Sequence, residues 1–149
     1  NENELNCRIE VELEKYTKKV QIESRIIGDL AINHIVPTAV TYQNRLLENL
    51  RGLRETFTPE EYEILGADRK ELVKEIQLHI LEIKKLVYEM TEARKISNHL
   101  ESEIKKAYSY QEMVSPYLEK IREHIDHLEL EIDDEIWPLP KYRELLFTK

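Results

Sequence analysis

The apolar residues of this chain recur every three or four positions, and the longest series without proline or glycine runs from Asp68 to about Gln111. Its apolar members are Leu72, Ile76, Ile80, Ile83, Val87, Met90, Ala93, Leu100, Ile104 and Ala107. This spacing predicts one long helix with a single buried stripe, because a helical turn takes 3.6 residues. At 1.5 Å per residue the helix would be about 65 Å long, so other helices must cover its stripe. The stripe skips near Asn98, where the pattern allows either a loosened helix or a break.

A second series starts near Glu4 and continues in the same phase past Pro37. Its members are Leu5, Ile9, Leu13, Tyr16, Val20, Ile27, Ala31, Ile35, Ala39, Tyr42, Leu46, Leu50, Leu53 and Phe57. Proline removes a backbone donor and clashes with the carbonyl four residues earlier, so it disfavours an undisturbed helix. Because the apolar phase is unbroken, we expect a single kinked helix. The alternative is a break at Val36, with Thr38 capping a new helix.

Between these two series lie clear signals for a short helix. Thr58 is predicted to cap a helix from Pro59 to Leu65, and Glu61 completes a capping box with it. Gly66 is expected to end this helix, and Asp68 to cap the long one that follows.

The last helical series begins at Ser115-Pro116, which we expect to be a boundary because the residue before proline avoids helical angles. The series steps by three and four residues through Leu118, Ile121, Ile125, Leu128 and Ile132. This is the seam of a helix that packs along another helix. No segment alternates apolar and polar residues as a strand would. Residues 1–149 are therefore predicted to form one all-α domain, a bundle of long antiparallel helices with a kinked first helix.

The C-terminal tail is unusually apolar and carries two prolines, which favour an extended chain around Ile136–Pro140. We expect Trp137, Leu139, Tyr142 and Phe147 to dock the tail into a groove between helices, since aromatic anchors favour burial. The alternative is that the tail docks onto a neighbouring domain.

Composition narrows the possible functions. A net charge of −8 argues against a nucleic-acid surface, because neutralising phosphates requires a basic face. No apolar run approaches the roughly 20 residues of a membrane-spanning helix. The single Cys7 cannot form an internal disulfide, which favours a reducing compartment.

The best candidate for a metal site is the trio His124, His127 and Glu131, which share one helix face and would suit zinc. They flank an apolar seam, so we favour solvated edge residues. None of the five histidines follows a glutamate by three positions, which argues against a ferritin-like site. No glycine-rich phosphate loop is present. We therefore assign no catalytic, cofactor-binding or metal-binding residue, and expect these residues alone to be inactive.

Four blocks of sequence resemble the type III glutamine synthetases, the large bacterial form of that enzyme. The blocks are residues 11–25, 28–40 and 42–44, together with the stretch DDEIWPLPKYRELLF at 133–147. The segment from Thr56 to Ser109 is matched more loosely. The resemblance covers most of the chain.

The resemblance implies that this chain is the helical domain that follows an upstream catalytic domain. That family joins ammonia to glutamate through a γ-glutamyl phosphate, using ATP and a divalent metal such as Mg²⁺. It is cytoplasmic and assembles as a homo-oligomer of stacked rings. The helical domain would then support subunit packing or regulation. If the resemblance is set aside, the alternative is a free-standing helical scaffold that binds a partner helix or itself.

Overall fold

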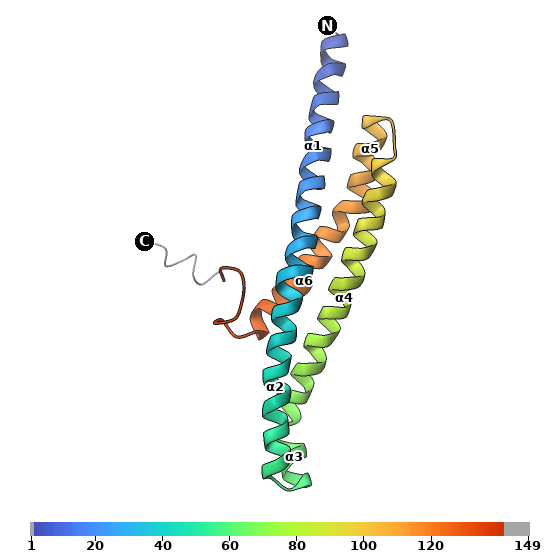
Figure 1. Ribbon diagram of the computed structural model, residues 1–149. Helices are drawn as coiled ribbons and strands as arrows, with labels where there is room; N and C mark the ends of the chain where they lie inside the picture. Colours follow the sequence, from blue (N-terminus) through green and yellow to red (C-terminus); the bar gives the residue numbers. More distant parts are fainter. Residues whose placement is uncertain (1, 142–149) are drawn as a thin grey trace, which may run out of the picture.

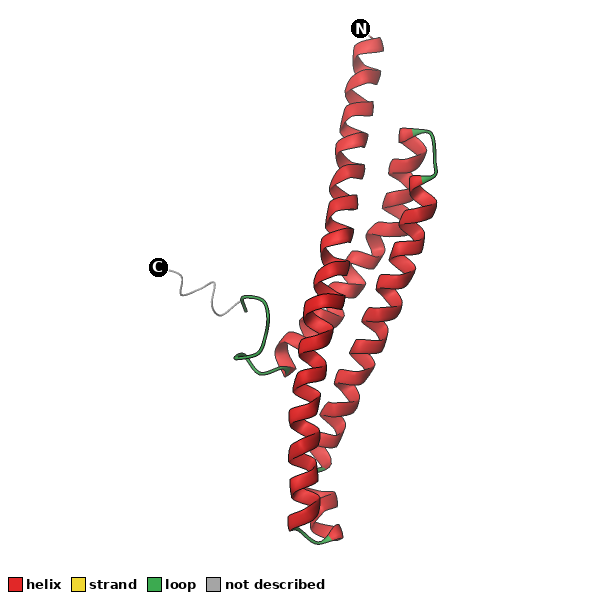
Figure 2. Cartoon of the chain, viewed as in Figure 1, coloured by secondary structure: helices red, strands yellow, loops and turns green. Residues whose placement is uncertain are grey.

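The computed structural model describes residues 2–141, with side chains from Glu4 onward. In this part of the chain every regular element is a helix, and no strand occurs (Figure 2). The helices form three long antiparallel segments, and the residues described after α6 form a tail at the side of the bundle (Figure 1). The predicted all-α bundle is therefore confirmed.

The first segment consists of α1 (Glu2–Leu30), a π-helical turn η1 (Ala31–Ile35) and α2 (Val36–Thr56). It continues without a break across Pro37, as the unbroken apolar phase predicts. In η1 the Val36 N–H reaches back five residues to the carbonyl of Ala31. We infer that the wider turn gives the proline ring room. The alternative of a break at Val36 is wrong, because Thr38 Oγ1 donates to the His34 carbonyl at 2.8 Å rather than capping a new helix.

The short helix α3 (Pro59–Leu65) has the predicted bounds and capping box. Thr58 N–H donates to Glu61 Oε2 at 3.0 Å, and Glu61 N–H donates to Thr58 Oγ1 at 3.4 Å. The predicted cap at Asp68 is wrong. Gly66 stays in the right-handed helical region and its carbonyl accepts from Lys70 N–H, so α3 passes almost directly into the next helix.

The long helix α4 (Ala67–Asn98) ends thirteen residues before the predicted end at Gln111. Asn98 is followed by a short loop, after which Ser102 Oγ accepts from Lys105 N–H and starts α5 (Glu103–Ser109). The chain reverses direction here (Figure 1). Of the two alternatives near Asn98, a loosened helix and a break, the break is therefore the one observed.

The predicted boundary at Ser115-Pro116 is also wrong. A second π-helical turn, η2 (Tyr110–Val114), joins α5 to α6 (Ser115–Glu131) without interruption. The Ser115 N–H donates to the Tyr110 carbonyl five residues back, as in η1. Pro116 thus lies inside a continuous helical segment.

The core runs along α4, which contacts both α2 and α6, while α1 packs against α5 and α6. The fully or almost fully buried side chains include Ile35, Ala39, Ile76, Ile83, Met90, Tyr110, Val114, Ile121 and Leu128. The seam predicted from Leu118 to Ile132 faces this core.

Candidate docking site

A turn after α6 sends the tail back toward the bundle. The carbonyl of Asp133 accepts from the N–H groups of Ile136 and Trp137 at 3.1 and 3.2 Å. Its carboxylate accepts from the Glu135 N–H at 2.9 Å. Asp133 also lies 3.4 Å from the guanidinium of Arg45, which connects the turn to α2. These contacts stabilise the reversal.

The reversal places Trp137 against the core, where its side chain is only 8% exposed. Leu139 and Ile136 are half-buried and pack against the same cluster. Of the four residues expected to dock the tail, Tyr142 and Phe147 lie outside the described residues.

Lys141 caps the end of α6. Its Nζ donates to the carbonyls of Glu129 and Ile132 at 2.6 and 2.8 Å and lies 2.6 Å from Asp134 Oδ1. A helix leaves its last carbonyls without intrahelical partners and carries partial negative charge there, so a cation stabilises it. The side chain is 12% exposed, and its Nζ lies 5.7 Å from the centre of the Trp137 ring. Sequence reasoning did not single out Lys141, although a lysine beyond an acidic helix end was the available signal.

The tail forms one wall of a groove of about 640 Å³, whose other walls are α1 and α6. Apolar side chains line much of it, among them Ile26, Ile27, Leu30, Leu118, Ile125 and Leu139. Acidic residues, including Glu23, Glu119, Asp126 and Glu129, also line it, whereas Arg122 is its one basic lining residue among those described. The groove therefore suits an apolar segment with basic flanks.

The first turns of α1 extend beyond the tip formed by α4 and α5 (Figure 1). Along the predicted stripe the exposed fraction falls from 60% at Leu5 and 48% at Ile9 to 4% at Val20. The N-terminal end of this stripe, at Leu5 and Ile9, is thus an apolar surface open to solvent.

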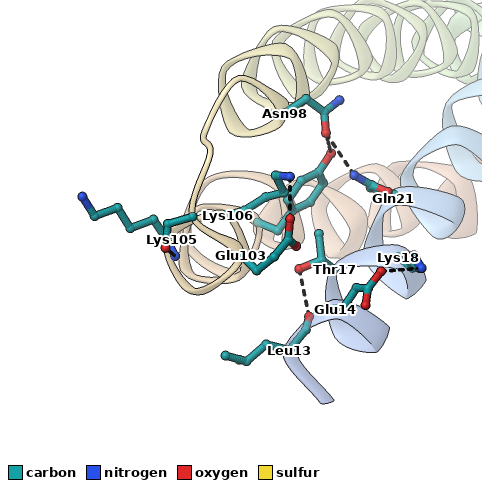
Figure 3. Close-up of polar contacts among 11 residues, drawn as sticks. Leu13, Glu14, Thr17, Lys18, Gln21, Asn98, Glu103, Lys105 and Lys106 are labelled. Atoms are coloured by element: carbon teal, nitrogen blue, oxygen red, sulfur yellow. Dashed lines mark hydrogen bonds and ion pairs between the residues drawn. The ribbon is translucent and has the colours of Figure 1, made fainter. Parts of the chain in front are cut away.

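A small polar network joins α1 to the end of α4, further along α1 than that surface. Asn98 Oδ1 accepts from Gln21 Nε2 at 3.0 Å and from the Tyr110 hydroxyl at 2.6 Å. Figure 3 shows the Asn98 carboxamide at the end of α4 facing Gln21 on α1. These bonds fix α1 against the α4–α5 reversal, so the direction of its projecting end is set by the core.

The metal candidates meet a third histidine on another helix. His79 of α4 lies with its Nδ1 2.9 Å from His124 Nδ1, and its ring stacks on that of His127 with centroids 5.1 Å apart. His127 is exposed, as expected of an edge residue, whereas His124 and Glu131 are half-buried. Among the described residues no group of three such side chains converges well enough to hold a metal ion.

Comparison with known proteins shows which sequences this chain is similar to. The family described as "Glutamine synthetase C-terminal domain" matches residues 1–54. A glutamine synthetase of Bacteroides fragilis (strain YCH46) is 71% identical over 149 residues, which is 100% of this chain. This chain belongs to the glutamine synthetase C-terminal domain family. A type-3 glutamine synthetase of Dictyostelium discoideum is 26% identical over 98% of the chain.

The chain spans 20% of the length of each of these two relatives. None of the described helices is both long enough and apolar enough to cross a membrane.

Proposed function

We propose that this chain is the non-catalytic C-terminal helical domain of a type III glutamine synthetase, an ATP-dependent ligase that makes glutamine from glutamate and ammonia. The observation that carries the proposal is the 71% identity along every residue of the chain to a glutamine synthetase. ATP and a divalent metal such as Mg²⁺ would be bound by the upstream catalytic domain. The enzyme would act as a homo-oligomer in the cytoplasm, in accord with the reducing compartment that the single Cys7 favours.

The role proposed for this domain is to support the packing of subunits. Its open end is the apolar surface of Leu5 and Ile9, which are 60% and 48% exposed. An apolar surface that continues the stripe of a buried helix is typical of an interface. We propose that this end of α1 packs onto the catalytic domain of the same or a neighbouring subunit, and that the core of the helical domain holds it in position.

The test is the double substitution Leu5→Glu and Ile9→Glu in the full-length polypeptide. Both side chains are exposed, so the helical domain itself should fold as before. Burying two carboxylates in an interface is strongly unfavourable, so glutamine formation should fall, and the assembly should also dissociate if the interface joins two subunits. The matched control is Ile64→Glu at the opposite end of the bundle, where the side chain is 78% exposed.

Mass is measured by light scattering after size-exclusion chromatography, and glutamine formation by a coupled assay with ATP. Assembly and activity equal to those of the control would refute the role assigned to α1. Glutamine formation by residues 1–149 alone would refute the proposal that this domain is non-catalytic.

A further inference from the structure

The contact between His79 and His124 limits how many protons the two rings can carry. Their Nδ1 atoms are 2.9 Å apart, so one must donate a hydrogen and the other must accept it. An imidazolium bears hydrogen on both nitrogens and cannot accept. The pair can therefore hold no charge or one positive charge in this geometry. A second proton would place two N–H groups against each other and break the contact.

Charged and titratable neighbours make the cluster of His79, His124 and His127 sensitive to the number of protons that it carries. On α6, His127 stacks on His79 with an interplanar angle of 16°, so its protonation sets a further positive charge against the same ring. The carboxylates that face the cluster are Glu75 and Glu82 from α4 and Glu131 from α6. Of these, Glu131 has its Oε2 buried without a hydrogen-bond partner.

The cluster sits beside the end of α6 that carries the tail. Lys141 binds the carbonyls of Glu129 in the last turn of α6 and of Ile132 just after it, on either side of Glu131. We propose that the three histidines form a proton-sensitive clasp between α4 and α6, and that a second proton opens it and frees the last turns of α6 together with the tail. This clasp does not depend on the function proposed above, since it is built within the described residues.

The electrostatic environment of His79 also favours opening of the clasp at low pH. Burial lowers the pKa of His79 from 6.5, and the neighbouring His124 and His127 lower it further. The closed clasp therefore takes up a proton less readily than the open one, and its stability falls as pH drops through about 6.5. Burial, followed by Glu75, raises the pKa of Glu131 above 4.5. That shift has the opposite sign, because it favours the closed form at low pH, and it acts at lower pH, just above the ordinary carboxyl pKa of 4.5.

The clasp can be tested by hydrogen–deuterium exchange of the full-length polypeptide, followed by mass spectrometry of peptides from residues 115–141. If opening takes up one further proton on a histidine of ordinary pKa, the opening equilibrium should rise about tenfold between pH 7.5 and 5.5. Exchange rates are corrected for the intrinsic effect of pH. Peptides from α3, far from the cluster, should show no such rise.

The decisive variant combines His79→Gln with His124→Gln, which keeps hydrogen-bonding side chains that do not titrate. The tenfold rise should disappear in this variant and persist in His34→Gln, an exposed histidine away from the cluster. If the double variant is already open at pH 7.5, the variant that combines His79→Phe with His124→Phe decides, because it retains both rings but removes every titrating nitrogen from the contact. A rise that survives in these variants, or its absence in the wild-type protein, would overturn the proposal.

Discussion

Replacing Trp137 by alanine tests whether the tail is part of the stable bundle. The residue lies in the core cluster and is 8% exposed, yet it belongs to a segment without regular secondary structure. If the contacts around it stabilise the fold, truncation should destabilise the whole domain. If the tail is held only loosely, truncation should change little.

The magnitude follows from the buried surface. A tryptophan buries about 150–250 Å². At about 25 cal/mol per Å² this corresponds to roughly 4–6 kcal/mol. Measured truncations of buried aromatic residues cost about 3–5 kcal/mol. Because the groove beside Trp137 lets the tail relax, we expect the lower end, about 3 kcal/mol, and a fall in Tm of about 6–12 °C for a chain of this size.

The assay is thermal and urea unfolding of residues 1–149, followed by circular dichroism. The matched control is Leu130→Ala on α6, where the side chain is 85% exposed and its removal should change stability by no more than about 0.5 kcal/mol. Since Trp137 is the single tryptophan, its fluorescence reports the same site independently. Wild-type emission should be that of a buried indole, poorly quenched by iodide.

The reasoning would be refuted if Trp137→Ala were as stable as Leu130→Ala while wild-type emission was that of an indole in water. In that case the tail would not dock on its own bundle, and Trp137 would be available to a neighbouring domain.

Three further substitutions test local features, each by urea unfolding. Lys141→Met should lower the free energy of unfolding by about 1–3 kcal/mol, because the carbonyls at the end of α6 lose a charged donor, and it should shift Trp137 emission toward red. Gly66→Ala should destabilise by about 1 kcal/mol, since a Cβ there would lie 3.0 Å from the Tyr62 carbonyl oxygen. Gly52→Ala should instead stabilise by about 0.5–1 kcal/mol, because apart from its chain neighbours and the backbone of its own helix no atom lies within 4 Å of the new Cβ. An equal effect of the two glycine changes would contradict this account.

The sequence predicted those parts of the fold that depend on short-range signals. The capping box at Thr58 and Glu61 is a local arrangement that spans four residues, and it is present as predicted. The continuity of the first segment also followed from phase alone. In contrast, the end of α4 at Asn98 was only one of two alternatives left open by the sequence, because apolar residues recur at helical spacing on both sides of the reversal. A one-dimensional pattern records the face that is buried, but it does not record the direction in which the chain then runs.

The candidate sites were less predictable, because they join distant residues. His79 and His124 are 45 positions apart, and each taken alone is an ordinary histidine on a helix face. Lys141 meets the carbonyls of α6 only after the turn at Asp133 has reversed the chain. The histidine contact has no signature in local sequence, and the signal for Lys141 was only a lysine beyond an acidic helix end. Each contact became visible only once helix packing was known.

The prolines inside two of the helical segments explain how the projecting end of α1 and the helix that carries the tail both come to depend on one core. Pro37 and Pro116 each follow a π-helical turn, at Ala31–Ile35 and Tyr110–Val114, whose extra residue moves the backbone carbonyls relative to the proline ring. Both turns bury side chains against α4 and its neighbours. Without them the prolines would be expected to break the segments, and the projecting end of α1 would not be continuous with α2, nor α5 with α6. The π-helical turns thus let the apolar end of α1 and the helix that carries the tail be positioned by the same buried residues.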